Sequence, residues 1–306
     1  MAFIGCGGSS GSDGGGGKTN NGNWNAGAGA LGTLAQTRDG ASWNVQAVAP
    51  GDLYSVVCVD NLEGWVAGAG GAVGHTLDGG TTWTWQKSGF TTDLRTVRFA
   101  AGGFGVVAGD GGALAVSYDG GGHFAPVSST VTTSLRGAAV AEGGALAVVV
   151  GDGGVLLRSG DFGRTWARVP VDGAGDFTGV AVDALGKRVF AVDGAGSVWS
   201  SGDQSVTYSR ETVAAAPLAA IALADDGTRA IAAGARGTVL ARDGSGAWSA
   251  LDSGVATDLR AALVTDGGHR SLVAGDGGTL LSSDDGGAWR RIPLATTATL
   301  YGLDDL

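Results

Sequence analysis

Glutamate, lysine and methionine are scarce in this chain of 306 residues, which has three glutamates (Glu63, Glu142 and Glu211), three lysines and one methionine. These long, unbranched side chains favour α-helices, so their scarcity argues against layers of helices. Glycine is abundant instead, with 60 residues, while hydrophobic residues make up 43% of the chain. The composition therefore predicts an all-β protein with enough apolar surface for a large core.

Cysteines, cationic residues and long apolar runs are also few. The cysteines are Cys6 and Cys58, and two such residues exclude a disulfide framework. Cys58 lies in the apolar run LYSVVCVD and is expected to be a buried thiol. No run approaches the roughly 18 apolar residues of a membrane-spanning helix. With a net charge of -10, the chain lacks the basic surface that nucleic-acid binding requires.

The N-terminal sequence FIGCGGSSGSDGGGG resembles the processing site of bacterial lipoproteins, in which a small residue, here Gly5, precedes a lipidated cysteine, here Cys6. Residues 1–22 are predicted to form a flexible tether ahead of a folded domain at 23–306. A basic and apolar leader is missing, so a signal would require residues upstream of Met1. The sequence thus indicates an exported, lipid-anchored protein of the bacterial cell envelope; the alternative is a disordered N-terminus without an anchor.

A short motif of the form Ser/Thr-x-Asp-x-Gly-x-x-aromatic recurs every 39 to 42 residues. Its aspartates are Asp39, Asp78, Asp119, Asp161, Asp203, Asp243 and Asp284, and the aromatics that follow them are Trp43, Trp83, Phe124, Trp166, Tyr208, Trp248 and Trp289. Each carboxylate can accept backbone N–H bonds within its turn, and each aromatic can pack between neighbouring sheets. The fifth copy, SGDQSVTY, lacks the glycine and the tryptophan, so its unit is expected to be irregular.

Each repeat contains four short apolar runs separated by turns rich in glycine and aspartate. One unit reads SLRGAAVA, GALAVVVG, GVLLRSG and TWARVPV, and GDGG sequences suited to tight hairpins stand at 109–112, 151–154 and 275–278. Four strands in about 41 residues are typical of β-propeller blades. The chain is therefore predicted to form a seven-bladed β-propeller of four-stranded antiparallel blades.

The first unit lacks its innermost strand, because NWNAGAGALG aligns with the second strand of its neighbour, GWVAGAGGAVG. The C-terminal sequence TLYGLDDL matches the innermost strand DLYSVVCVD at 52–60. We therefore expect the C-terminal strand to complete the first blade and close the ring.

The repeats resemble the BNR or Asp-box repeat of sialidases, xyloglucanases, sortilin-type receptors and the photosystem II stability/assembly factor family. The last family is the most similar, because TDLRTVRF…GVVAGDGGALAVSYDGG and TDLRAALV…SLVAGDGGTLLSSDDGGAW match its whole blade. The resemblance covers about residues 23–306 and implies a seven-bladed propeller. Members of this family engage partner polypeptides through a basic patch, so it also implies a protein or peptide partner.

The third residue of each innermost strand is expected to face one end of the propeller axis. Around the ring these residues are Tyr54, Arg95, Arg136, Thr178, Ala219, Arg260 and Tyr301, and the arginines and tyrosines form one arc over five blades. Such side chains recognise carboxylates and extended peptides, so Tyr54, Arg95, Arg136, Arg260 and Tyr301 are the candidate binding site. Three cations are expected to stand out in an acidic protein. The alternative is that each arginine pairs with the aspartate two residues earlier or stacks between blades.

Motifs that suggest nucleotide or metal binding lack the necessary context. GGGGKT at 14–19 lacks the first glycine and the strand of a P-loop, and GAGALG at 27–32 falls on a predicted hairpin. His75, His123 and His269 occupy different repeat positions and are expected in turns or at the surface. No cofactor or metal ion is therefore expected.

A glycosidase of the usual kind needs two carboxylates about 5 to 9.5 Å apart. The three glutamates are expected to be solvated, and Asp52, Asp93, Asp176 and Asp258 begin innermost strands, where they either approach the axis or cap turns. The arginine triad and Arg-Ile-Pro signature of sialidases are missing. The sequence therefore favours a non-enzymatic scaffold that binds protein, with two alternatives: a glycan-binding or glycan-cleaving propeller, and a structural module without an axial ligand.

Overall fold

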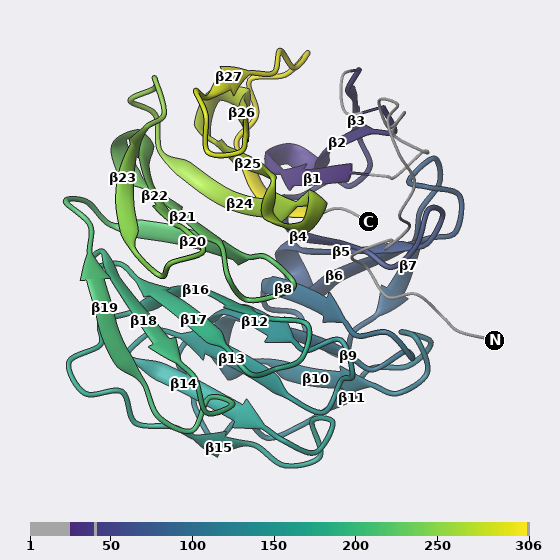
Figure 1. Cartoon of the computed structure of the whole chain (residues 1–306). Helices are drawn as coiled ribbons and strands as arrows, with labels where there is room; N and C mark the ends of the chain where they lie inside the picture. The colour runs from purple at the N-terminus through teal and green to yellow at the C-terminus, as the bar shows by residue number, and fades with distance from the viewer. Residues whose placement is uncertain (1–24, 40–41, 305–306) are drawn as a thin grey trace, which may run out of the picture.

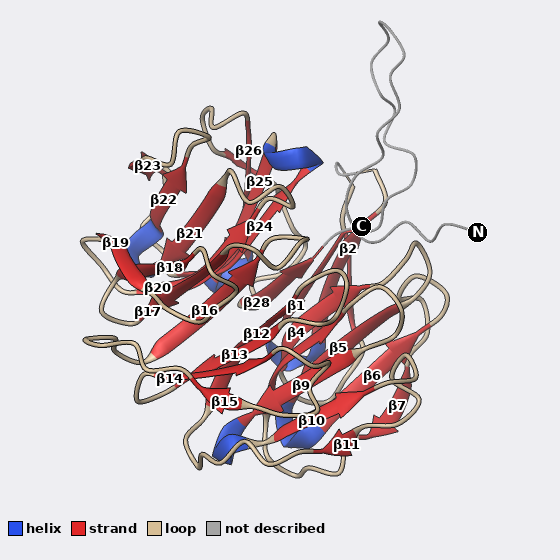
Figure 2. Ribbon diagram, turned by 60° about the horizontal axis from the view of Figure 1, so that its bottom comes forward, coloured by secondary structure: helices blue, strands red, loops and turns tan. Residues whose placement is uncertain are grey.

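The computed structural model describes residues 25–39 and 42–304, which form seven four-stranded antiparallel sheets around a central axis (Figure 1). The predicted all-β, seven-bladed propeller is confirmed. The tether at 1–22 and Cys6 lie outside the described residues. Helical segments in the described part are 3₁₀ turns of three residues (Figure 2), and none of them is long and apolar enough to cross a membrane.

We number the blades 1 to 7 along the chain. Blade 1 consists of β28 (Leu300–Asp304), β1 (Asn25–Gly29), β2 (Thr33–Thr37) and β3 (Asn44–Ala47). Blade 2 consists of β4 (Leu53–Cys58), β5 (Gly64–Gly68), β6 (Ala72–Thr76) and β7 (Thr84–Lys87). Blade 3 consists of β8 (Leu94–Phe99), β9 (Gly105–Gly109), β10 (Leu114–Ser117) and β11 (Ala125–Pro126). Blade 4 consists of β12 (Leu135–Val140), β13 (Ala147–Gly151), β14 (Val155–Ser159) and β15 (Ala167–Arg168).

The remaining three blades have the same order of strands from the axis outward. Blade 5 consists of β16 (Phe177–Val182), β17 (Val189–Asp193), β18 (Ser197–Ser201) and β19 (Ser209–Val213). Blade 6 consists of β20 (Leu218–Leu223), β21 (Ala230–Gly234), β22 (Thr238–Arg242) and β23 (Trp248–Asp252). Blade 7 consists of β24 (Leu259–Thr265), β25 (Arg270–Gly275), β26 (Thr279–Asp284) and β27 (Arg290–Arg291).

The last strand of the chain closes the ring. β28 pairs antiparallel with β1, so that Leu300 lies opposite Gly29 and Asp304 lies opposite Ala26. It takes the innermost position of blade 1, between the innermost strands β4 and β24 of its neighbours. The expected closure is therefore confirmed: β28 pairs with the inner edge of β1, and among the described strands the ring keeps only the short outer edge of each blade.

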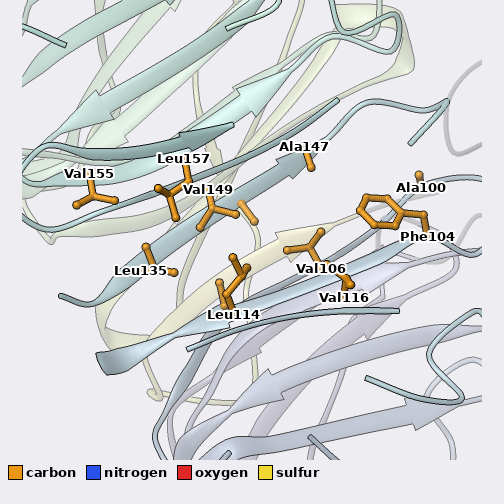
Figure 3. Packing of buried hydrophobic residues seen from close by; sticks show 12 residues of the cluster. Ala100, Phe104, Val106, Leu114, Val116, Leu135, Ala147, Val149, Val155 and Leu157 are labelled. Atoms are coloured by element: carbon orange, nitrogen blue, oxygen red, sulfur yellow. The ribbon is translucent and has the colours of Figure 1, made fainter. Parts of the chain in front are cut away.

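The hydrophobic core is divided into seven clusters, one between each pair of neighbouring blades. Between blades 3 and 4, Val106 and Leu114 meet Leu135 and Val149 (Figure 3). Each of the seven repeat aromatics packs against one cluster, as expected: Trp43, Trp83, Phe124, Trp166, Tyr208, Trp248 and Trp289. The thiol of Cys58 is buried in the cluster between blades 1 and 2, also as expected.

Two ends of the ring carry different turns. At one end, which we call the hairpin face, turns join the second and third strands of each blade. At the other end, the aspartate-turn face, lie the turns from the first to the second strand and the repeated aspartate motifs between the third and fourth strands. The start of each innermost strand therefore lies at the hairpin face, and its end lies at the aspartate-turn face.

The repeated aspartates hold their own turns together. In blade 2, Oδ1 of Asp78 accepts bonds of 2.8 Å from the Thr76 hydroxyl and the Thr82 backbone N–H, while Oδ2 accepts one of 2.6 Å from the Thr82 hydroxyl. These bonds, those from Thr82 above all, stabilise the ionised carboxylate and lower the pKa of Asp78 to about 2. The expected local role of the motif is therefore present here.

The aspartate turn is regular in the fifth copy of the motif and differs in the seventh copy. Asp203, in the fifth copy, accepts bonds from Ser201 and Thr207 like the regular copies, because Gln204 and Ser205 adopt the positive φ values of 62° and 66° that glycine would favour. The turn of this blade is therefore regular, but its outer strand is not: the register of β18 and β19 shifts between Val198 and Trp199, a shift not seen in the described outer strand pairs of the other blades, so the expected irregularity is confirmed at the strand and not at the turn. In the seventh copy Asp284 instead lies 3.7 Å from Nε of Arg270, and no such turn-holding bonds are seen in the part of the chain that the structure describes.

Candidate functional site

A β-bulge in every innermost strand presents one side chain at the hairpin face. In β8, Leu94 pairs with Gly109 and Thr96 pairs with Ala108, so Arg95 is the extra residue of the bulge. The same shift of register occurs in all seven blades, at Tyr54, Arg95, Arg136, Thr178, Ala219, Arg260 and Tyr301. Because a bulge redirects the side chain of its extra residue, the repeat places these seven residues, which we call the rim, in equivalent positions around the axis.

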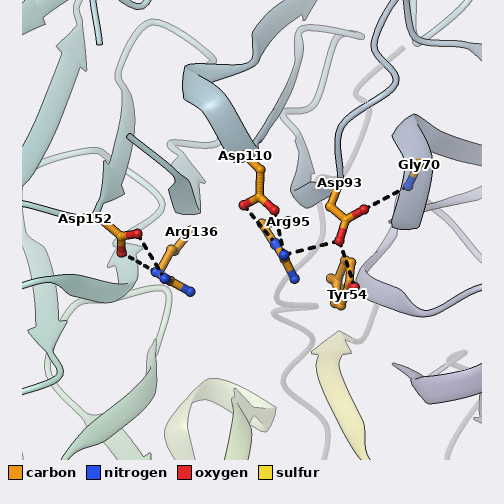
Figure 4. Close-up of polar contacts among 7 residues, drawn as sticks. All are labelled: Tyr54, Gly70, Asp93, Arg95, Asp110, Arg136 and Asp152. Atoms are coloured by element: carbon orange, nitrogen blue, oxygen red, sulfur yellow. Dashed lines mark hydrogen bonds and ion pairs between the residues drawn. The ribbon is translucent and has the colours of Figure 1, made fainter. Parts of the chain in front are cut away.

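The tyrosines and one arginine of the rim are in contact. The rings of Tyr54 and Tyr301 lie with their centroids 5.6 Å apart, although these residues are far apart in sequence. The Arg95 guanidinium lies 4.2 Å from the centre of the Tyr54 ring, and the Tyr54 hydroxyl donates a 3.0 Å bond to Asp93 (Figure 4). Burial, together with this bond, raises the pKa of Tyr54 to about 12, so the phenol stays protonated at neutral pH.

The rim arginines are each paired with an aspartate at the tip of the hairpin in the same blade. Arg95 donates bonds of 3.1 and 2.6 Å from Nε and Nη2 to the two carboxylate oxygens of Asp110. Arg136 forms the same fork with Asp152 (Figure 4), and Arg260 forms it with Asp276 through bonds of 3.1 Å. Bidentate pairs of this kind fix the orientation of the guanidinium.

The sequence left open that each rim arginine pairs with the aspartate two residues earlier in the chain. This pairing occurs for two of the three arginines, and in both it adds to the pairing with the hairpin aspartate. Arg95 lies 3.2 Å from Asp93, and Arg260 lies 3.2 Å from Asp258, in addition to their hairpin partners. The expectation that the three cations would stand out electrostatically is wrong. Five carboxylates surround the three guanidinium groups, namely Asp93, Asp110, Asp152, Asp258 and Asp276.

A signal for these pairs exists in the sequence. The three GDGG hairpins, at 109–112, 151–154 and 275–278, occur in the three blades that have arginine at the rim. Blades 1, 2 and 6 have alanine at the first turn position, and their rim residues are tyrosine or alanine. Asp193 of blade 5 is the exception, because its Oδ2 accepts a bond from the Trp199 indole and its rim residue is a threonine.

The four aspartates that begin innermost strands cap turns rather than standing free at the axis. Oδ1 of Asp93 accepts a 2.9 Å bond from the backbone N–H of Gly70, at the hairpin tip of the preceding blade (Figure 4). Asp52, Asp176 and Asp258 bind Leu31, Gly153 and Arg236 in the same way, with bonds of 2.9, 2.7 and 2.9 Å. These bonds join neighbouring blades and confirm the turn-capping interpretation.

Several polar residues differ from their expected surroundings. His75 lies on strand β6 and is partly buried: its ring stacks on Trp65 with the ring centroids 3.8 Å apart, and its Nε2 lies 3.0 Å from Oε1 of Glu63. Glu211 is not simply solvated, because it accepts a 2.6 Å bond from the Trp248 indole. Within residues 25–39 and 42–304, no group of three or more histidine, cysteine or acidic side chains is placed to hold a metal ion.

Comparison with known proteins supports the fold. No family model matches the chain, and no curated protein matches it by sequence. A structure of YCF48 bound to D1 peptide is 19% identical, with a TM-score of 0.62, and the match covers 82% of this chain and 89% of the other. A structure of YCF48 from Cyanidioschyzon merolae is 20% identical, with a TM-score of 0.63, and covers 80% and 86%. The chain thus shares the seven-bladed propeller fold of YCF48, and the resemblance inferred from the sequence is confirmed at the level of the fold.

Proposed function

We propose that this protein is a non-enzymatic scaffold that binds an extended polypeptide segment at the rim. The observation that carries the proposal is the ring of bulges, which aims arginine or tyrosine side chains at one end of the axis from five consecutive blades. YCF48, which has the same fold, binds a D1 peptide, and this supports a peptide as the class of ligand.

The paired state of the arginines defines what the rim can recognise. Nε and Nη2 of Arg95, Arg136 and Arg260 are occupied by aspartates, so the fork that would bind a carboxylate is already filled. The remaining nitrogen, Nη1, makes no hydrogen bond to the described residues and can donate to a peptide carbonyl. Since the surrounding carboxylates outnumber the arginines, we expect neutral or basic segments to bind better than acidic ones.

A binding assay on matched variants tests this proposal. We expect a library of extended peptides to contain segments that bind the wild-type protein and lose about tenfold or more in affinity with Arg95→Ala plus Arg260→Ala. Arg290→Ala plus Arg291→Ala is the matched control, because these exposed arginines lie on the outer strand β27. The proposal of a peptide-binding rim would be contradicted if both double variants lost peptide affinity equally, or if the wild-type protein selected no peptides from the library.

The carbohydrate-active alternative is tested in parallel. Asp93 and Asp258 each accept a backbone N–H bond from the preceding blade and lie 3.2 Å from an arginine, so both carboxylates are engaged in the structure of the rim and are not free to act as the catalytic pair of a glycosidase. We therefore expect no release of sugar from a panel of envelope glycans. Release of sugar that is abolished by Asp93→Asn or Asp258→Asn would show an enzyme instead.

We further propose that the protein is exported and anchored through a lipid on Cys6. β1 begins with Asn25 at the aspartate-turn face, so the preceding segment joins the propeller at the end opposite the rim. An anchored protein would then hold the rim away from the membrane. Intact mass of protein expressed in a bacterial host from the complete coding region, with Cys6→Ala as control, tests the modification; an identical mass for the two, apart from the substitution, would refute it.

A further inference from the structure

A pocket of about 530 Å³ opens on the aspartate-turn face, over blades 4 and 5 and at the end of the ring opposite the rim. The turn 141–146 between β12 and β13 and the turn 184–186 between β16 and β17 form two of its walls. Arg158, near the end of β14, Gln204, in the fifth aspartate turn, and Ala101, in the turn between β8 and β9 of blade 3, also line it. Its volume is in the range of pockets that hold small ligands or a few residues of a peptide.

The walls of the pocket combine polar and apolar surface in similar amounts. Ala101, Ala141, Ala145 and Leu146 line it, together with Leu185, which is 70% exposed. A leucine so exposed within a concave surface gains most when an apolar group covers it. The pocket therefore favours a ligand with an aliphatic or aromatic part.

Arg158 supplies one positively charged group in these walls. Its Nε donates a 2.7 Å bond to the carbonyl oxygen of Gln204, which orients the guanidinium, and no carboxylate of the described residues lies within ion-pair distance of it. Gly160 leaves room for the guanidinium, because a Cβ there would lie 2.9 Å from Nη1. The terminal nitrogens are thus available to an anion inside the pocket.

The position equivalent to Arg158 in blade 2 has a basic residue with an acidic partner, which Arg158 lacks among the described residues. His75, at the position equivalent to Arg158, is paired with Glu63, which immediately precedes the neighbouring strand β5. The residue of blade 4 equivalent to Glu63 is Leu146, which lines the pocket. Blade 4 therefore has an arginine where blade 2 has a histidine, and an apolar residue where blade 2 has the acid that pairs with it.

We propose that this pocket binds the C-terminal residue of a polypeptide, with the terminal carboxylate on Arg158 and an apolar side chain against Leu146 and Leu185. Glu142, on the wall toward Asp225 of blade 6, can accept a backbone N–H or a basic side chain of a preceding residue. Arg158 and Glu142 place opposite charges on two walls of the pocket. A peptide end is long enough to contact both residues, whereas a small acid contacts only Arg158, so the pocket fits a peptide end better. This site is independent of the rim and does not rest on the function proposed for it.

The test uses the full chain and the labelled peptide Gly-Ser-Gly-Ala-Ala-Leu, with either a free carboxylate or a C-terminal amide. We expect saturable binding of the free acid and about tenfold or more weaker binding of the amide, because the amide cannot form the charged fork with Arg158. Arg158→Met is expected to lose a similar factor, and Arg158→Lys, which keeps the charge, is expected to lose less.

Arg168→Met is the matched control, because Arg168 is an exposed arginine of the same blade whose guanidinium bonds to Gly153 at the hairpin face. Arg168→Met should leave the affinity for the free-acid peptide unchanged. The rim variant Arg95→Ala plus Arg260→Ala should also leave it unchanged, and this result would distinguish the pocket from the binding site proposed at the rim. Thermal unfolding of each variant checks that the propeller is intact. Equal affinity of the acid and the amide, or unchanged affinity in Arg158→Met, would overturn the proposal.

Two further measurements test the identity of the ligand. Leu185→Ser is expected to reduce the preference for peptides ending in leucine over peptides ending in alanine, because it removes apolar wall. N-acetyl-leucine should bind more weakly than the peptide, since it cannot reach Glu142. If N-acetyl-leucine binds as tightly as the peptide, the pocket is a site for small hydrophobic acids and the peptide-end proposal is wrong.

Discussion

The carboxylate of Asp304 accepts a 2.8 Å hydrogen bond from the backbone N–H of Cys58, a residue 246 positions earlier in the chain. Asp304 ends the strand that completes blade 1, and Cys58 ends the innermost strand of blade 2. The bond therefore lies at the junction where the ring closes. Arg98, on the innermost strand of blade 3, is close enough to stabilise the ionised carboxylate.

Asp304 makes the stability of the closure depend on pH. Its burial raises its pKa to about 6, above the usual value of about 3.9, so the folded protein binds this proton more tightly than the unfolded chain. The resulting stabilisation is complete below about pH 4 and is lost as the pH rises through about 6. We expect Asp304→Asn, which keeps an acceptor for Cys58, to remove this loss and to stabilise the protein at pH 7.5 by up to about 3 kcal/mol.

Urea unfolding between pH 4 and pH 7.5 measures this effect. The control is Asp172→Asn, in an exposed loop. The control should retain the wild-type dependence on pH. The same slope for Asp304→Asn and the wild type would show that Asp304 does not titrate in this range.

Leu300 tests how much the closing strand contributes to stability. Its side chain is fully buried in the cluster between blades 7 and 1, so Leu300→Ala leaves a cavity there. We expect it to lower the free energy of unfolding by about 2 to 5 kcal/mol. Leu62→Ala, at a leucine that is 53% exposed, should change it by less than about 0.5 kcal/mol. Equal effects of the two substitutions in denaturant unfolding would mean that the first blade folds without this strand.

The aspartate turns predict a loss of stability in acid. Hydrogen bonds within the turns lower the pKa of Asp78, Asp119 and Asp161 to about 2, chiefly through Thr82, His123 and Thr165 respectively. Because these values lie below that of the unfolded chain, the stabilisation is present above about pH 4 and is lost as the pH falls through about 2.

We expect Asp78→Asn to lower the melting temperature at pH 7 and to weaken its fall between pH 4 and pH 2. Asp284→Asn is the comparison within the repeat, because among the described residues the carboxylate of Asp284 accepts no bond from its turn and instead lies 3.7 Å from Nε of Arg270. It should change the melting temperature less and leave the acid dependence as in the wild type. Identical melting curves of the two variants at both pH values would be evidence against a special role of the regular turns.

The number of blades, the closing strand and the places of the aromatics were determined by the sequence alone. The regular units satisfy their own turns, as Asp78 does with Thr76 and Thr82, and every unit returns its aromatic to the equivalent interface between blades. A regular spacing of local interactions is visible in a linear sequence, because the bonding partners lie within four residues of each other. The contact between Tyr54 and Tyr301 followed from the closure and could be predicted with it.

Only the tertiary structure decided the chemistry of the rim and of the pocket. Arg95 and Asp110 are 15 residues apart and meet because a hairpin returns the chain to the start of its innermost strand, where a bulge turns the arginine toward the aspartate. Asp93 caps the turn at Gly70, which belongs to another blade, and Arg158 lies without an acid because Leu146 stands where blade 2 has Glu63. Charge in the sequence therefore did not predict charge at the surface, since pairing depends on distances that the packing of neighbouring strands and blades creates.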